Sequence, residues 1–396
     1  MQNFSERHAN FMAVIAFLIV PMSGFAIDIY VPSLPIITKY FNVSAGITQI
    51  TVTVFLIAYG ISQFIAGNFL DAYGRRKITL ISLILFSLFS LLIPFSPSIA
   101  IVLLLRFLQG LCVGFFAVAK RAIFLDLFNG DKLHIILAYM TVAWSIGPII
   151  APGIGGYLQT YFGWQACFYF LAAYTFSLAI LEFFFVPETI RQKNPLIVKS
   201  IINTYTFIFS HTKFSLALFG LGFAYAMVIL FHLLGSFLIQ NQLGYSALEY
   251  GNFAVIMGLA WMIGGIINRN LIRIDMLLKI KYAIFMVIII GLIMFGLGLA
   301  TLNLYSILIP AFITHIMAGL IFNNYFSFCL AMFPQYAGLA AGITGSGAYM
   351  ITFLASSILA EILPTSSILS LASGYLVLSV MSLITYLIIM KLEKSH

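Results

Sequence analysis

Long apolar stretches with few or no charges recur along almost the whole chain, and they constrain its fold more than any other feature. A helix needs ~20 mostly apolar residues to cross a bilayer, because each residue rises only about 1.5 Å. Only 8% of the residues are charged, against roughly a quarter in soluble domains. The sequence predicts an all-α membrane protein with twelve transmembrane helices, although its short joints also allow eleven or thirteen. The stretches are 11–32, 46–67, 78–97, 99–124, 134–158, 165–187, 214–239, 248–268, 281–300, 303–326, 337–360 and 369–390.

Lysine and arginine lie mainly on one side of this predicted membrane arrangement. With the N-terminus inside, 15 of the 19 fall in inner segments, and only Lys39 falls in an outer loop. Cytoplasmic loops carry such an excess, so we expect both termini in the cytoplasm. The net charge of +8 then reflects membrane orientation, and we expect no nucleic-acid partner. We also expect the first stretch to be retained, because no small-x-small cleavage site follows its apolar run.

A polar segment, Pro187–Lys213, divides the chain into two halves with six apolar stretches each. Equal halves joined by a polar loop favour parallel structural repeats around a central cavity. We therefore predict an N-terminal six-helix bundle over 1–187, a cytoplasmic linker over 188–213 and a C-terminal six-helix bundle over 214–396.

The joint after the second stretch holds the most specific motif. It reads Gly67-x-x-x-Asp71-x-x-Gly74-Arg75-Arg76-Lys77. Two glycines permit a tight reversal and a close approach of helices. The aspartate can cap the third helix or face Arg75. An ordinary basic inner loop is the alternative interpretation.

Three further segments complete a resemblance. The fourth stretch contains Arg106-Phe107-Leu108-Gln109-Gly110, and the fifth contains Gly147-Pro148-Ile149-Ile150-Ala151-Pro152-Gly153-Ile154-Gly155-Gly156. The first contains Asp28-Ile29-Tyr30-Val31-Pro32-Ser33-Leu34-Pro35. Together with the joint, these segments resemble the major facilitator superfamily, and the 28–35 run is similar to its Bcr/CflA-like branch of bacterial drug:proton antiporters. The sharp motifs are confined to the N-terminal half.

The resemblance implies a fold, a location and a gate. It implies two six-helix bundles around a cavity that opens alternately to either side, in a bacterial inner (cytoplasmic) membrane. It implies a cytoplasmic latch of Asp71, Arg75 and Asp126, within a conformational gate that also includes Gly67, Gly74 and Arg121. It is also typical of a bend in the fifth helix, for which glycine and proline are suited; packing alone is the alternative. The bend residues are Gly147, Pro148, Pro152 and Gly156.

Two charges lie deep in predicted helices. Asp28 lies about 10 Å below the outer end of the first helix, counted from Pro35, and Arg106 about 12 Å below that of the fourth, counted from Ser98, at ~1.5 Å per residue. Intramembrane charges are functional candidates because they are costly. We expect Asp28 and Arg106 to face one cavity and to couple transport to protons, since desolvation favours a protonated carboxyl and a guanidinium favours an ionised one. The alternatives are a backbone tie for Asp28 and a hydrogen-bond hub for Arg106.

Other polar and aromatic residues are candidates for the cavity. Aromatic walls tolerate flat or cationic solutes, although such residues also face lipid in many membrane proteins. Lys120 either extends to the headgroups or lines the inner cavity. We expect Glu182 and Glu361 to be solvated at helix ends, and His232 and His315 to be packing residues or groups that titrate near neutral pH. The predicted substrate cavity comprises Tyr30, Tyr59, Gln109, Lys120, Trp144, Tyr225, His232, Trp261 and Tyr349.

These features favour a secondary active transporter over an enzyme. The chain has no phosphate-binding Gly-x-x-x-x-Gly-Lys-Ser/Thr run, and Cys112, Cys167 and Cys329 lack metal spacing. We expect no cofactor and no metal, the proton gradient as energy source, a small-molecule substrate, and a monomer in the lipid bilayer. The first hypothesis is a proton-coupled efflux antiporter of drugs or metabolites. The alternatives are a transporter of an anionic metabolite such as a carboxylate siderophore, and a receptor or scaffold that transports nothing.

Overall fold

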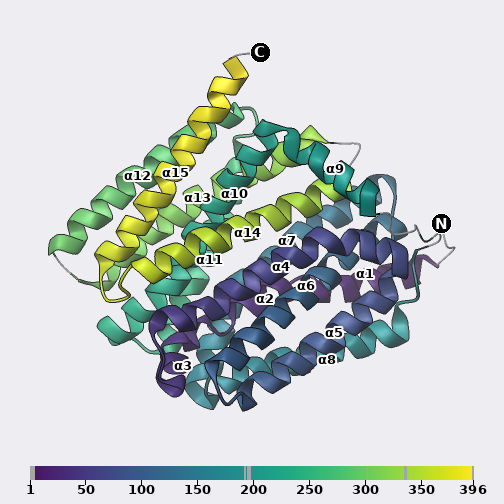
Figure 1. Cartoon of the computed structure of the whole chain (residues 1–396), viewed down its shortest axis with the longest axis horizontal. Helices are drawn as coiled ribbons and strands as arrows, with labels where there is room; N and C mark the ends of the chain where they lie inside the picture. Colours follow the sequence, from purple (N-terminus) through teal and green to yellow (C-terminus); the bar gives the residue numbers. More distant parts are fainter. Residues whose placement is uncertain (1–4, 191–192, 194–197, 301, 334–336, 395–396) are drawn as a thin grey trace.

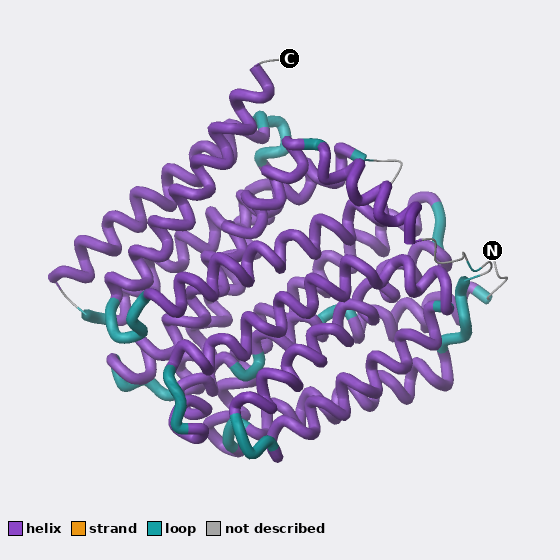
Figure 2. Tube along the Cα trace, viewed as in Figure 1, coloured by secondary structure: helices purple, strands orange, loops and turns teal. Residues whose placement is uncertain are grey.

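The computed structural model describes residues 5–190, 193, 198–300, 302–333 and 337–394. Within these residues every regular element is a helix, and twelve helical spans are long and apolar enough to cross a membrane (Figure 2). The predicted all-α fold with twelve spans is therefore confirmed.

The first half contains a broken span followed by five others. The first span, Glu6–Phe41, continues past Pro35, the residue from which the depth of Asp28 was estimated. Proline lacks an N–H donor, and Pro21 and Pro32 lie at two of its breaks. The elements are α1 (Glu6–Ile19), α2 (Met22–Asp28), η1 (Val31–Ser33), α3 (Leu34–Phe41), α4 (Ala45–Tyr73), α5 (Arg75–Leu92), η2 (Ile93–Phe95), α6 (Ile99–Leu127), α7 (Gly130–Phe162) and α8 (Gln165–Phe185).

The second half follows a connection that itself contains a helix. This helix, α9 (Val198–Ser210), lies inside the predicted linker and was not expected. Tyr205 of α9 stacks on Phe64 of α4, with ring centroids 4.1 Å apart. The remaining elements are α10 (Thr212–Leu230), the π-helices η3 (Phe231–Gly235) and η4 (Leu238–Gln242), α11 (Ala247–Asn270), α12 (Met276–Ala300), α13 (Leu304–Met332), α14 (Ala337–Ile362) and α15 (Ile368–Lys394).

The two halves form two bundles that lie side by side, purple to blue and green to yellow in Figure 1. They meet mainly along α7 with α11 and along α4 with α14. Glycine allows these backbones to approach closely: a Cβ on Gly251 of α11 would lie 2.5 Å from the carbonyl oxygen of Pro152 on α7.

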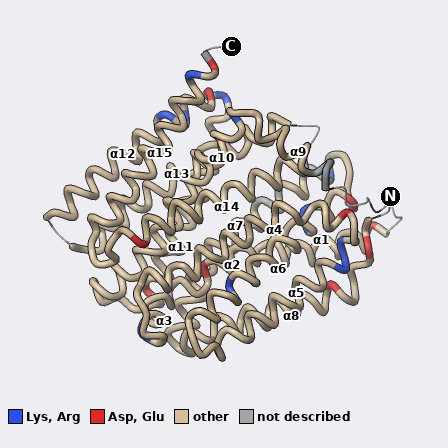
Figure 3. Tube along the Cα trace, in the orientation of Figure 1, with Lys and Arg blue, Asp and Glu red and all other residues tan. Residues whose placement is uncertain are grey.

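Charge distinguishes the two ends of the molecule. Figure 3 shows lysine and arginine concentrated at the end where both chain termini lie, here called the charged end. The loop after α3 marks the opposite end (Figure 1), and the last turn of α3 carries Lys39. This separation matches the charge pattern from which the orientation was predicted.

Candidate functional site

A small cavity lies between the two bundles. The first bundle contributes α2 and α7 to its wall, and the second contributes α10, η3, α11, α13 and α14. The volume of this cavity is ≈ 40 Å³, which is room for about three waters. Pockets for drug-sized ligands measure about 300–1,000 Å³. A solute of that size therefore requires the bundles to move apart.

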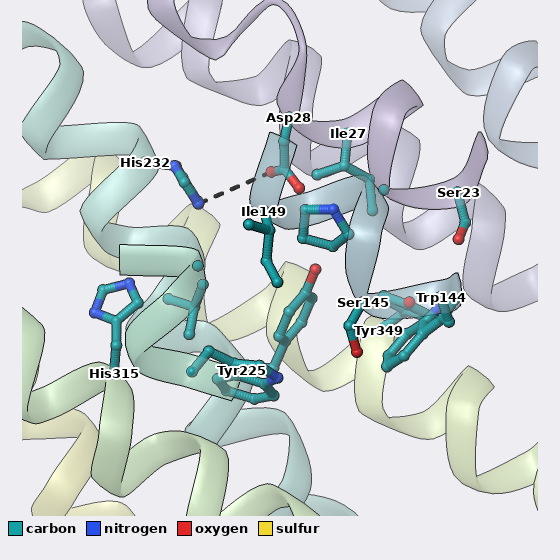
Figure 4. Close-up of a pocket in the computed structure, with 15 residues that line it drawn as sticks. Ser23, Ile27, Asp28, Trp144, Ser145, Ile149, Tyr225, His232, His315 and Tyr349 are labelled. Carbon is teal, nitrogen blue, oxygen red and sulfur yellow. Dashed lines mark ion pairs between the residues drawn. The ribbon is translucent and has the colours of Figure 1, made fainter. Parts of the chain in front are cut away.

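Asp28 contributes a carboxyl group to this cavity. It is the last residue of α2 and is only 2% exposed. Its Oδ1 accepts no hydrogen bond within the described part of the chain. It lies 3.9 Å from Nε2 of His232, which points toward it from the other bundle (Figure 4). The acid singled out in the sequence thus lies in the cavity wall, without a hydrogen bond from its own bundle.

Two histidines also line the cavity: His232, which was among the predicted cavity residues, and His315, which was not. His232 lies in η3, and its Nδ1 is 3.4 Å from the hydroxyl of Tyr250 on α11. The Nδ1 of His315, on α13, is 2.7 Å from the carbonyl oxygen of Ala311 one turn earlier. Sequence separation concealed this grouping. Its only signal was that both residues fall within apolar spans of one half.

Aromatic side chains form much of the remaining wall. Trp144, Tyr225, Trp261 and Tyr349 all line the cavity, as expected for them. Tyr225 makes edge-to-face contacts with Trp261 and Tyr349, with centroid distances of 5.9 Å and 5.7 Å. The site therefore combines one carboxyl and two imidazoles with an aromatic surface.

Arg106 does not line the cavity, so the expected shared crevice with Asp28 is wrong for this structure. Its side chain is fully buried, with the guanidinium 4.5 Å from the ring centre of Tyr30 and 4.4 Å from that of Phe55. Its Nε donates to the carbonyl oxygen of Thr51. These contacts turn it toward α4, as in the alternative hydrogen-bond hub.

Four other predicted cavity residues, Tyr30, Tyr59, Gln109 and Lys120, also lie outside the wall. Two of them form hydrogen bonds inside the first bundle. Tyr30 pairs with Thr51, and Gln109 donates to Ser90 at 2.6 Å. The ring of Tyr59 packs against Tyr349, 4.5 Å between centroids, and so lies behind the wall.

Lys120 forms an ion pair that the sequence did not suggest. Its Nζ lies 2.6 Å from Oε1 of Glu182 on α8, and the side chains are 1% and 0% exposed. The expected solvated position of Glu182 is therefore wrong, as is a cavity position for Lys120. The two residues are opposite charges near the same ends of the fourth and sixth spans, and that common depth was the available signal. Glu361 is exposed, as expected.

The predicted latch is assembled at the charged end. Arg75 pairs with Asp126 and lies 3.7 Å from Asp71. Gly74 has φ +101°, a backbone conformation that favours glycine. A Cβ on Gly67 would meet nothing within 4 Å in the described structure, so the close approach expected there is absent. Arg121 joins none of the ion pairs among the described residues of this cluster.

Residues at the start of the connection complete the latch, and sequence reasoning missed them. The carboxylate of Glu188 accepts the backbone N–H groups of Arg75 and Arg76 at 3.0 and 3.2 Å. Thr189 donates to Asp126 at 2.7 Å. An acid at the N-terminus of α5 satisfies donors that the helix leaves free. The segment after α8 is thereby tied to the gate.

The glycines and prolines of α7 mark close contacts. The helix runs through Pro148 and Pro152 as one element. A Cβ on Gly147 would lie 2.4 Å from the carbonyl oxygen of Pro21, and one on Gly156 would lie 2.5 Å from that of Ala247. Packing is therefore part of the role of this segment, and the bend stays a prediction.

Among the described residues three hydrogen bonds join the bundles, and the first two of them lie between the cavity and the opposite end. Gln49 donates to the carbonyl oxygen of Leu233 at 2.7 Å, and Gln240 donates to that of Pro32 at 3.0 Å. Ser346 donates to the carbonyl oxygen of Gly60 at 2.6 Å. Each bond crosses from one bundle to the other. In this conformation the molecule is held closed on that side of the cavity.

Sequence similarity to known proteins extends over most of this chain. A bicyclomycin resistance protein homolog from Haemophilus influenzae is 25% identical over 361 residues, which cover 90% of this chain and 91% of that protein. Multidrug resistance protein D from Escherichia coli K12 is 26% identical over 355 residues, 86% of each chain. These similarities agree with the Bcr/CflA-like resemblance of the first span.

Solved structures share the fold. A D-xylose–proton symporter superposes with a TM-score of 0.76 at 13% identity, covering 96% of this chain and 97% of that chain. The human organic anion transporter MFSD10 gives 0.71 at 17% identity, with coverage of 96% and 99%. The sequence profile of the Major Facilitator Superfamily matches residues 16–360. The chain therefore belongs to the Major Facilitator Superfamily of membrane transporters.

Proposed function

We propose that this transporter exports small, largely apolar compounds in exchange for protons, by exposing its central cavity alternately to the two sides of the membrane. The observation that carries the proposal is the buried carboxyl of Asp28, which faces the cavity and has no hydrogen bond at Oδ1. The aromatic wall supports an apolar solute. Relatives named for bicyclomycin and multidrug resistance support export of toxic compounds.

Proton exchange requires an acid whose preferred form changes with its surroundings. In the closed cavity, burial favours the neutral carboxyl of Asp28. When the cavity opens to water or admits a solute, solvation and new contacts favour the ionised form. Proton and substrate then bind alternately. Each can drive transport of the other only because it binds the two conformations with different affinities. Arg106 does not line the cavity in this conformation.

The alternative, an anionic metabolite such as a carboxylate siderophore, is less well supported. The positive charges that could favour such an anion are Arg106, Lys120 and Arg121. Lys120 is paired with Glu182, and Arg106 is packed between two aromatic rings. None of the three lines the cavity within the described structure. An anion bound there would meet the carboxyl of Asp28 and no permanent positive charge.

Replacing Asp28 tests the proposal. In proteoliposomes with an imposed pH gradient, Asp28→Asn should reduce proton-driven transport of a lipophilic drug by more than about tenfold, ~1.4 kcal/mol or more, because an amide cannot carry the proton. The same substitution should remove the resistance that the wild-type protein gives to a pump-deficient bacterium.

The matched control is Glu361→Gln, which neutralises an exposed acid at a helix end and should leave transport unchanged. Wild-type protein that moves no drug under any gradient, but takes up a carboxylate siderophore, would support the alternative. Full proton-driven transport in Asp28→Asn would exclude the proposed coupling.

A further inference from the structure

The only acid in the described wall of the cavity faces a base from the other bundle. Asp28 ends α2 in the first bundle, and His232 lies in η3 in the second. Oδ1 and Nε2 are 3.9 Å apart, and the side chains are 2% and 5% exposed. That distance allows an ion pair, and one water could bridge it, because the cavity has room for about three.

The backbone around His232 is unusual. Five residues, Phe231–Gly235, form a π-helix, a rare form that is frequently found at functional sites. The hydroxyl of Tyr250 lies 3.4 Å from Nδ1, which leaves Nε2 directed toward Asp28 (Figure 4). The wider turn thus coincides with the residue that meets the acid.

Hydrogen bonds between the bundles lie close to this pair. Leu233, the residue after His232, accepts from Gln49 of α4. Pro32, four residues after Asp28, accepts from Gln240 of η4. Both bonds cross the interface on the side of the opposite end. Opening that end breaks them and separates the acid from the base.

We propose that Asp28 and His232 together form the proton site, and that one proton held between them ties the bundles closed at the opposite end. This proposal rests on the proposed proton coupling and adds its second partner. The proton passes from the carboxyl O–H to form the imidazole N–H, directly or through one water. The product is a carboxylate facing an imidazolium, and no other bond changes.

Other charged and titratable groups surround the pair, and none replaces His232. Arg106 packs on Tyr30 outside the cavity wall, and His315 is bonded to a carbonyl of its own helix. Tyr250 contacts His232 rather than the carboxyl. These groups are Arg106 from α6, Tyr30 before η1, Tyr225 from α10, Tyr250 from α11, His315 from α13, Tyr349 from α14 and Tyr375 from α15.

The test measures closure directly, without substrate. Spin labels on Tyr40→Cys of α3 and Asn241→Cys of η4, both exposed, report the distance across the opposite end in the full chain in lipid nanodiscs. The three native cysteines are buried. If one proton stabilises the closed form, its population rises as the pH falls. His232→Gln should move the midpoint of that rise down by about one pH unit, a tenfold weaker proton contribution.

A double-mutant cycle separates a shared proton from a structural effect of His232. In an Asp28→Asn background, His232→Gln should cause no further change, because the two side chains act as one site. His315→Gln is the matched control and should leave the midpoint unchanged. His232→Asn, a smaller neutral residue, should reproduce the shift and replaces the glutamine variant if that variant does not fold.

The outcomes distinguish this inference from the proposed function. A His232→Gln midpoint equal to that of His315→Gln, with the pH response still lost in Asp28→Asn, would overturn the shared site and leave proton coupling through Asp28 intact. Absence of any pH response in the wild-type protein, together with no proton-driven transport, would overturn both. A shift that disappears with Asp28→Asn supports the inference.

Discussion

The buried charged residues of this transporter differ in whether they have a partner. Those in an ion pair are expected to stabilise the fold, and the one without a hydrogen bond is the candidate for transport chemistry. Lys120 and Glu182 form an ion pair removed from water, whereas Asp28 lacks a hydrogen bond at Oδ1. Removing one partner of a buried ion pair destabilises the fold, because the other charge is left uncompensated. A buried acid without such a bond is free to gain or lose a proton. We therefore expect different roles for the two acids despite their similar burial.

Lys120→Met should destabilise the protein by about 3–5 kcal/mol, because Glu182 would remain buried without its cation. Thermal unfolding in detergent, followed by loss of the monodisperse peak, measures this change. The double variant Lys120→Met/Glu182→Leu should recover most of the loss, since it buries no charge. Equal loss in the single and double variants would indicate that the pair is dispensable and that packing alone has been disturbed.

Among the helices, small residues on α7 set how closely the bundles approach. Gly156 meets the backbone of Ala247, and Gly153 meets Val255 on α11. Glycine is less favourable than alanine in a helix by about 1 kcal/mol. Its presence on this face therefore reflects contact with the other bundle rather than helix formation.

Gly156→Ala should hinder closure at the opposite end, because the new Cβ would lie 2.5 Å from the carbonyl oxygen of Ala247. We expect transport in proteoliposomes to fall by about tenfold, ~1.4 kcal/mol in the rate-limiting step. The spin-label distance across that end should lengthen. Gly296→Ala is the control, since a Cβ there meets nothing within 4 Å, and it should behave as wild type. Normal closure in Gly156→Ala would contradict the assigned contact.

For the whole molecule, charge is concentrated at the end that carries both chain termini (Figure 3). The latch of Asp71, Arg75 and Asp126 lies at the same end. Cytoplasmic segments carry this excess of lysine and arginine, so the charged end is expected to face the cytoplasm. Closure at the opposite end would then place this conformation with its outer side sealed.

Reporter fusions test this orientation. Alkaline phosphatase fused after Lys394 should be inactive, and green fluorescent protein fused there should fluoresce, because phosphatase folds only outside the cytoplasm. Phosphatase inserted at Asn303, between α12 and α13, should be active. The reverse pattern would invert the orientation, and with it the expected direction of export.

The length of the apolar stretches and the positions of the charges were enough to predict the twelve spans and the end of the molecule at which the charges lie. Each span must be apolar over its own length to cross the bilayer, so its own composition reveals it. The candidate acid Asp28 was also predictable, since an uncompensated charge within an apolar span is costly wherever it faces. These are properties of one segment at a time.

Partners across helices were not predictable in this way. The contacts of Asp28 with His232, of Lys120 with Glu182 and of Arg106 with Tyr30 join residues from different spans. Which face of a helix meets which neighbour depends on the rotation and close packing of all the helices together. The sequence indicates how deep a residue lies in the membrane, but it does not determine the rotation of its helix. Only the tertiary structure shows which side chains line the cavity and which are packed behind them.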